Sequence, residues 1–371
     1  MEPRGRLEGR YSRRAALAGA LALSACGRGR GDAQAQPYDA PNQRLPALGL
    51  RDMAQVPVGN CISTAELDNA DYVAMSVKQC SQIIPAWQFQ MEATLRPDGG
   101  FQFEDADRIA AFARANALAL HATALVWYTQ EPPALKALDG QPDRFALAVR
   151  NYVQAIAGRY RGQAGSWDVV NEPIRDDGSG LRDCLFSRNL GQEDYIVRAF
   201  AWAREADPSA MLVLNDYDLE RTPRKRWAFM RLVERLLKRG VPVQALGTQS
   251  HLDIGMDPAV CRPAMRELAT LGLPIRVSEL DVSFQAPRTS FMPRAQKLAL
   301  QAQLYAEVVG GFLELPRHQQ VGFAVWGLDD KRSWLRYRPG DGAAADCPCP
   351  FDDDERPKPA FFALADAFSR G

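Results

Sequence analysis

The feature of this sequence that most restricts its fold is a regular alternation of two kinds of segment, which begins near residue 56 and continues to the end of the chain. Short apolar runs of strand length alternate with longer segments whose apolar residues recur at helical spacing. The predicted strands are residues 56–62, 80–86, 117–127, 167–172, 211–216, 245–252, 275–282 and 321–328. The predicted helices are residues 105–116, 144–160, 194–205, 223–239, 258–271, 293–315 and 361–368.

The order of these elements predicts a fold of the α/β class. Pro223 and Pro258 stand where helices are expected to begin, and Gly240 and Gly272 stand where they are expected to end. No internal repeat and no linker divides the region. Eight strands that alternate with helices in this way predict a single (β/α)8 TIM barrel over residues 46–371.

Two glutamates stand at the ends of predicted strands. Residues 167–174 read WDVVNEPI, and Pro173 stops the strand because it has no N–H to donate to a neighbouring strand. Glu172 therefore lies where a loop begins, and residues 275–282, which read IRVSELDV, repeat the design with Glu279. The carboxyl ends of barrel strands carry the active site. A retaining glycosidase needs two carboxyl groups there, one as acid/base and one as nucleophile.

Polar and aromatic side chains collect at the same predicted rim. They are Asn215, Asp216 and Tyr217 after the fifth strand, Gln249 and His251 in the sixth, and Trp326 in the eighth. Sugar rings stack on indoles, and their hydroxyls need fixed donors and acceptors. The rim therefore predicts a polysaccharide or oligosaccharide as partner, and we expect the protein to be a monomer.

Charge and histidine content argue against other partners. The 45 basic and 45 acidic residues give a formal net charge of zero, so we expect no nucleic-acid partner. The three histidines lack metal-ligand spacing, and we expect neither a metal ion nor a cofactor. Six cysteines lie beyond residue 26, and an exported protein can pair them in disulfides or keep them as buried thiols. Both possibilities stay open.

The amino terminus has the pattern of a targeting segment. Ser12-Arg13-Arg14 precedes an apolar run over residues 15–23, which is about half as long as a membrane span. The arginine pair resembles a twin-arginine signal, and the tetrapeptide that ends in Cys26 resembles a lipobox. Residues 1–26 are therefore expected to be a signal peptide with a lipid anchor on Cys26, and residues 27–45 a flexible tether. We expect an exported protein that is anchored in the cell envelope (outer membrane or periplasm) and touches the membrane only through this lipid. A plain secretory signal, which would give a secreted protein, is the alternative.

Several motifs, taken in order, resemble those of glycoside hydrolase family 10, the endo-β-1,4-xylanases. They are LVW at 125–127, WDVVNEP at 167–173, NDY at 215–217, GTQSHL at 247–252, SELD at 278–281, WGLDDKRSW at 326–334 and KPAF at 358–361. The resemblance covers roughly residues 50–370. It implies a retaining endo-β-1,4-glycanase that hydrolyses xylan or a related β-linked glycan through a covalent glycosyl-enzyme.

The resemblance also implies roles for individual residues. Glu172 would be the acid/base and Glu279 the nucleophile, while Asn171 would bind the 2-hydroxyl of the reacting sugar. His251 and Gln249 would orient Glu279, and Asp281 would hold His251. Further substrate-binding residues would be Trp127, Thr123, Tyr217, Trp326, Trp334, Trp87 and Gln90.

This chain departs from the family pattern on two strands. Residues 85–90 read PAWQFQ, so that Ala86, Trp87 and Gln90 stand where the family has Glu, Asn and Lys. On the third strand, Thr123 and Tyr128 replace two histidines. The residues that carry the chemistry match the family, whereas those expected to grip the sugar one unit away from the cleaved bond do not.

Two other functions remain open. The first is a glycosidase or transglycosylase that acts on a different β-linked glycan or a decorated oligosaccharide. The second is a non-catalytic, lipid-anchored glycan-binding protein. Two carboxylates held close together argue against the binding protein, because each disfavours ionisation of the other and a binder gains nothing from that cost.

Overall fold

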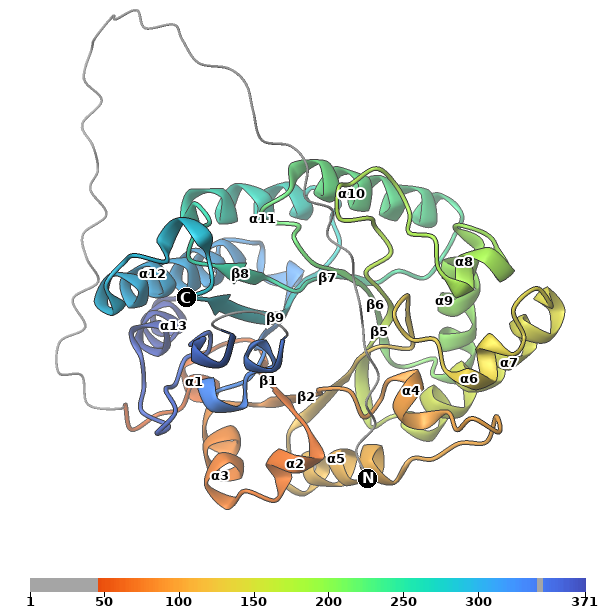
Figure 1. The fold of residues 1–371 in the computed structure, drawn as a ribbon, viewed down its shortest axis with the longest axis horizontal. Coiled ribbons are helices and arrows are strands. Elements are labelled where there is room, and N and C mark those ends of the chain that lie inside the picture. Colours follow the sequence, from red (N-terminus) through yellow and green to blue (C-terminus); the bar gives the residue numbers. More distant parts are fainter. Residues whose placement is uncertain (1–45, 339–342) are drawn as a thin grey trace, which may run out of the picture. The chain divides into compact units, whose positions relative to one another are not determined.

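The computed structural model describes residues 46–338 and 343–371. Within them, eight parallel strands form a closed barrel surrounded by helices, which confirms the predicted (β/α)8 fold (Figure 1). The barrel strands are β1 Val58–Ile62, β2 Gln82–Pro85, β3 Ala119–Ala122, β5 Ala164–Asn171, β6 Met211–Asp216, β7 Ala245–Thr248, β9 Ile275–Ser283 and β10 Gln320–Val325. The barrel closes because β10 pairs with both β1 and β9. The expected signal peptide, the Cys26 anchor site and the tether lie outside the described residues.

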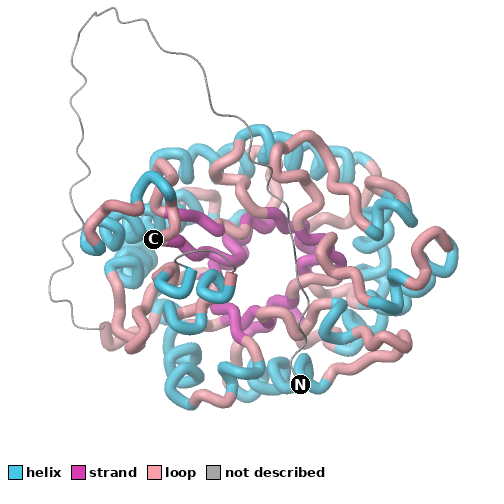
Figure 2. The backbone as a smooth tube through the Cα atoms, in the orientation of Figure 1, coloured by secondary structure: helices cyan, strands magenta, loops and turns pink. Residues whose placement is uncertain are grey.

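The helices form a ring around the strands (Figure 2). The longer ones are α3 Ala70–Gln79, α5 Glu104–Ala115, α7 Pro142–Arg159, α9 Asp194–Ala206, α10 Pro223–Lys238, α11 Cys261–Ala269, α12 Arg294–Leu313 and α13 Pro359–Arg370. Short α-helices lie before or between these elements along the chain: α1 Leu50–Met53, α2 Thr64–Leu67, α4 Met91–Thr94, α6 Pro133–Lys136 and α8 Leu185–Leu190. None of the helices in the described ranges combines the length and apolar character that crossing a membrane requires.

Most of the expected helix boundaries are found, but the short helices and one of the longer ones were not expected. Pro223 begins α10, and Gly240 follows its end with a φ of +73°, which a residue without a side chain adopts freely. The helix α3 between β1 and β2 was missed. Its buried side includes Ser76 and Gln79, and a helix that buries polar residues gives a weak apolar periodicity.

Two predicted strands are interrupted in the structure. The predicted strand 117–127 is divided into β3 and a short β4, Val126–Trp127, and the Thr123–Ala124 peptide bond between them is cis. The predicted strand 245–252 is divided into β7 and β8, His251–Asp253. Ser250 lies at this division with a φ of +58°, and this left-handed conformation takes the chain out of the strand ladder.

A layer of buried polar side chains fills the barrel below its mouth. His121 is fully buried, with Nδ1 2.7 Å from Ser166 Oγ and Nε2 3.1 Å from Asp168 Oδ2. Arg276 donates to Gln82 Oε1 at 2.6 Å. Burial lowers the pKa of His121, and the nearby Arg276 charge acts in the same direction. These groups belong to the core.

The cysteines of the described residues do not form disulfides. All six are free thiols, and five of them are buried. They are Cys61, Cys80, Cys184, Cys261, Cys347 and Cys349. Of the two alternatives that the sequence left open, the structure has the unpaired one.

Candidate active site

Glu172 lies one residue beyond the end of β5. Its backbone N–H donates to Asn215 O on the neighbouring strand at 2.8 Å, and its φ is +56°. This left-handed conformation is unfavourable for a residue with a side chain, so the surroundings must hold it in place. Pro173 follows and has no backbone N–H to donate to the neighbouring strand. As a result the Glu172 side chain is presented at the barrel mouth, where it is only 7% exposed.

The Glu172 carboxyl group has the electrostatics of a proton donor. Gln249 Nε2 donates to its Oε1 at 2.9 Å, and Asn171 Nδ2 donates to the same oxygen at 3.2 Å. Burial raises the pKa of Glu172 to about 7; the hydrogen bond from Gln249 opposes this shift, whereas the charges of Asp216 and Glu279 add to it. The carboxyl group is therefore largely protonated in mildly acidic solution.

The indole of Trp127 lies beside this carboxyl group. Its Nε1 is buried and has no hydrogen-bond partner within residues 46–338 and 343–371, yet it lies near enough to Glu172 to lower that group's pKa. The predicted site residue Trp127 is thus next to the candidate acid. Thr123, which was also predicted to bind substrate, is only 3% exposed.

Glu279 lies within β9 and is held by two donors. Asn215 Nδ2 donates to its Oε1 at 2.9 Å, and His251 Nε2 lies 3.3 Å from its Oε2. Burial raises the pKa of Glu279, and the hydrogen bond and charge of His251 oppose that shift. The group is 7% exposed, like Glu172.

His251 carries a positive charge between two carboxylates. Its Nδ1 lies 2.9 Å from Asp281 Oδ1, as expected for a residue held by Asp281. Burial disfavours the charge, but Asp281 and Glu279 outweigh burial and raise the pKa of His251 to about 10. A protonated imidazole favours the ionised form of Glu279, which is the form that a nucleophile needs.

Asn215 connects the two glutamates. Its Nδ2 contacts both Asn171 Oδ1, at 3.0 Å, and Glu279 Oε1. Gln249 Nε2 contacts Asn171 Oδ1 at 3.2 Å in addition to Glu172. A Cβ at Gly247 would lie 2.2 Å from Asn215 Oδ1, so only glycine leaves room for this amide.

The structure changes one expected role and adds two residues. Gln249 was expected to orient Glu279, but its amide donates to Glu172, and only its backbone carbonyl meets Glu279, accepting the N–H at 3.1 Å. Asn215 was seen at the end of a strand but was not included in the predicted site. Glu220 was missed: its Oε1 accepts the hydroxyl hydrogens of Thr248 at 2.5 Å and Ser250 at 2.6 Å, on either side of Gln249.

Aromatic residues border this charged centre. The ring centroids of Trp334 and Trp326 lie 5.0 Å and 6.2 Å from that of His251, and Trp334 Nε1 donates to Asp281 Oδ2 at 2.7 Å. Both tryptophans are partly exposed. Tyr217 is half-buried at the end of β6. Two of the predicted substrate-binding residues, Trp326 and Trp334, therefore lie next to the residue that holds Glu279.

The altered residues after β2 take up a defined arrangement. Trp87 is 50% exposed, so its indole is not packed into the barrel wall. Gln90 is held within its own loop region, because its Nε2 donates to Ala86 O at 3.4 Å and its Oε1 accepts from Gln130 Nε2 at 3.2 Å. An exposed indole is thus the group that this segment offers to solvent.

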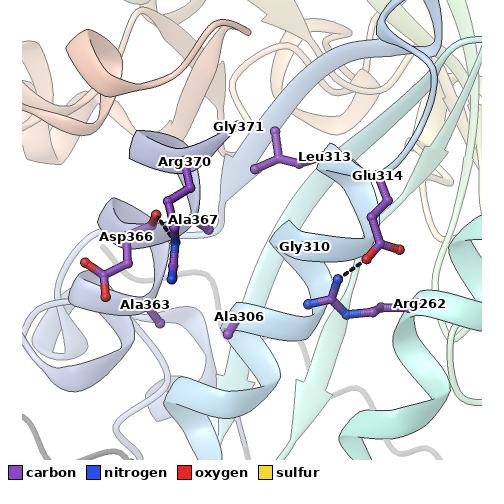
Figure 3. Close-up of a pocket in the computed structure, with 10 residues that line it drawn as sticks. All are labelled: Arg262, Ala306, Gly310, Leu313, Glu314, Ala363, Asp366, Ala367, Arg370 and Gly371. Carbon is purple, nitrogen blue, oxygen red and sulfur yellow. Dashed lines mark hydrogen bonds and ion pairs between the residues drawn. The ribbon is translucent and has the colours of Figure 1, made fainter.

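A separate cavity lies among the outer helices. It has a volume of about 420 Å³ and is lined by residues of α11, α12 and α13, together with Glu314 and Gly371 (Figure 3). Arg262 pairs with Glu314 in its wall. Neither Glu172 nor Glu279 lines this cavity, so it is not part of the candidate active site.

Comparison with known proteins agrees with this geometry. The family model for glycosyl hydrolase family 10 matches residues 49–367. An endo-1,4-beta-xylanase of Agaricus bisporus is 32% identical over 315 residues, which are 84% of this chain and 91% of the relative. A GH10 structure from Paenibacillus barcinonensis has a TM-score of 0.80 at 32% identity, covering 87% of this chain and 97% of the other. Native xylanase 10B from Thermotoga maritima has a TM-score of 0.79 at 26% identity, with coverages of 87% and 98%.

Proposed function

The chain belongs to glycosyl hydrolase family 10 and is a glycoside hydrolase, and we propose that it is a retaining endo-β-1,4-glycanase whose substrate is xylan or a closely related β-linked glycan. The observation that carries the proposal is the pair of buried glutamates, each with its own donors and joined through Asn215. The xylanases among its relatives support the choice of xylan.

In the first step Glu279 attacks the anomeric carbon of the reacting sugar. A bond forms between this carbon and a Glu279 oxygen while the bond to the leaving oxygen breaks, and Glu172 gives its proton to that oxygen. The raised pKa of Glu172 supports the role of acid, and the cationic His251 supports an ionised Glu279. Asn171, beside Glu172, is suited to hold the sugar 2-hydroxyl.

In the second step water displaces Glu279 from the sugar. The water oxygen attacks the anomeric carbon while Glu172, now ionised, takes a proton from the water, and the bond between the carbon and Glu279 breaks. Two inversions at the same carbon leave the β configuration of the substrate in the product. Proton NMR of the first product formed from a xylooligosaccharide tests this, and an initial α anomer would contradict the mechanism. A separation near 9 Å between the two carboxyl groups, instead of roughly 5–5.5 Å, would also contradict it.

The segment after β2 supports a preference within this substrate class. The family's Glu, Asn and Lys would offer charged or paired hydrogen bonds to sugar hydroxyls, whereas Ala86 offers none and Trp87 offers an aromatic face. Each lost hydrogen bond costs about 0.5–1.5 kcal/mol, so the loss of two or three lowers activity on linear xylan by about 10²-fold. The exposed indole favours substrates that place an apolar or bulky group there.

The triple variant Ala86→Glu, Trp87→Asn and Gln90→Lys tests this preference. It is expected to raise kcat/KM on linear xylooligosaccharides by about 10²-fold and to lower the relative rate on decorated ones. Trp227→Asn is the control, since this indole is also exposed, at 56%, but lies on the outer helix α10. If the triple variant gains nothing on linear substrates, the segment after β2 does not set specificity.

We also propose that the protein is exported and held in the cell envelope by a lipid on Cys26. Lipidated wild type should fractionate with membranes, because several acyl chains give stable anchoring. Cys26→Ser should move to the soluble fraction, because it lacks the residue that carries the lipid. Cys61→Ser, a change inside the barrel, should stay with the membranes. Soluble wild-type protein after cell lysis would instead support a plain secretory signal.

A further inference from the structure

Arg182 lies in the segment after Glu172, and its side chain reaches back to the backbone of that residue. Its Nε donates to Glu172 O at 3.0 Å. Its Nη2 donates to Asp176 Oδ1 and to Tyr217 Oη, each at 2.6 Å. The guanidinium also lies 4.4 Å from the ring centroid of Tyr128, and the side chain is only 11% exposed. Its donors are thus directed at fixed partners.

These contacts fix the chain on the C-terminal side of Glu172. The Arg182 N–H donates to Pro173 O at 2.8 Å, so side chain and backbone of one residue bind two successive carbonyl groups. Asp216 Oδ2 accepts from Ile174 N at 3.1 Å, and Asp216 is itself paired with the fully buried Lys225 at 2.8 Å. The segment after the acid is therefore attached both to β6 and to Arg182.

The backbone of Glu172 needs such support. With its φ of +56° it has left the strand, and β6 holds its N–H but not its carbonyl group. The Arg182 guanidinium is the side-chain donor to that carbonyl. Without it, the left-handed backbone of Glu172 is held less firmly, and a shift in its φ torsion changes the direction of the Cα–Cβ bond and, with it, of the carboxyl group.

We propose that Arg182 is a positioning residue for the acid/base Glu172, an inference that rests on the proposed function. Arginine fits this role because its planar guanidinium can bind a carbonyl, a carboxylate and a phenol together while its face stacks on a ring. Its contribution is made during proton transfer to the leaving oxygen, because transfer depends steeply on the position of the donor.

The variant Arg182→Met tests the proposal, because it removes every donor and keeps an unbranched side chain. On aryl β-xylobiosides with poor leaving groups, kcat/KM should fall by about 10²-fold, the scale of a misplacement near 1 Å. On dinitrophenyl glycosides, whose leaving group departs without a proton, kcat/KM should change by less than about threefold. Arg182→Lys, which keeps one charged donor, should recover part of the loss on poor leaving groups.

Arg175→Met is the matched control. Arg175 lies in the same segment, but its side chain is 44% exposed and pairs with Asp183 at the surface. This variant should retain wild-type rates on both classes of substrate. Thermal unfolding of each variant reports on any general loss of structure.

Two outcomes would overturn the positioning role: no loss in Arg182→Met, or equal losses on poor and good leaving groups. Glu172→Gln, measured on the same substrates, separates this failure from failure of the proposed function. If Glu172→Gln depends on the leaving group and Arg182→Met does not, only the role of Arg182 is wrong. If neither variant shows the dependence, the assignment of Glu172 as acid is wrong.

Discussion

Replacing Glu279 by Ala is expected to reduce turnover of every glycan substrate by at least about 10⁴-fold, the scale on which losing one member of a catalytic group acts. Without this carboxylate no covalent glycosyl-enzyme forms, and no other group in the site stands in its place. The fold should persist, because Asn215 and His251, which hold Glu279, keep other partners in Asn171 and Asp281. Initial rates on xylan and circular dichroism of the variant measure both expectations.

Added azide gives a sharper test of the same residue. In Glu279→Ala the small anion can occupy the vacated space and attack the anomeric carbon once, which yields a glycosyl azide of inverted configuration. The control is Glu205→Gln, which removes a surface partner of Arg150 and should keep wild-type rates. Turnover of Glu279→Ala within tenfold of wild type, on the order of 1 kcal/mol, would contradict the role of nucleophile.

Replacing Glu172 by Gln should produce a loss that depends on the leaving group. General acid catalysis contributes about 10²–10⁴-fold, so hydrolysis of xylan should fall by that factor. Formation of the glycosyl-enzyme from a dinitrophenyl glycoside should be nearly unchanged, because its leaving group needs no proton. A burst of dinitrophenol followed by slow turnover is the expected signature, since the second step still lacks its base.

The pH profile of the wild type follows from the same two groups. Glu172 must be protonated in the first step, and its pKa is raised to about 7, so kcat/KM should fall as the pH rises through that value. Glu279 must be ionised, and because burial raises its pKa too, kcat/KM should also fall toward acid pH. Glu172→Gln should lose the alkaline decline and keep the acidic one. An alkaline decline that survives in this variant would assign it to another group.

The sequence predicted the barrel and the two glutamates because both depend on local patterns. Alternating apolar runs and helical periodicity reveal strands and helices, and Pro173 marks where the strand that carries Glu172 ends. The helix α3 escaped detection because it buries Ser76 and Gln79, polar groups that apolar periodicity cannot count. The break in the strand at Ser250 was not predicted, because its left-handed φ accompanies a hydrogen bond to Glu220, a residue far away in the sequence.

The partners of the catalytic groups were harder to predict for a related reason. Whether Gln249 meets Glu172 or Glu279 depends on how far β7 is shifted along β6 and β9, and this register is a property of the closed barrel. The same holds for Asn215, whose amide reaches two strands at once only because Gly247 leaves space for it. Residue type alone indicated a polar rim, and only the three-dimensional arrangement assigned each donor to its acceptor.

The two donors to Glu172 have a consequence for where its proton can reside. Gln249 and Asn171 both donate to Oε1, and together they occupy the two lone pairs of that oxygen. A proton that returns to the carboxyl group from water must therefore bind Oε2. Amide groups do not titrate in the working pH range, so this asymmetry does not change with pH. One oxygen of Glu172 thus serves as the acceptor for both amides, and the other is the one suited to carry the exchangeable hydrogen.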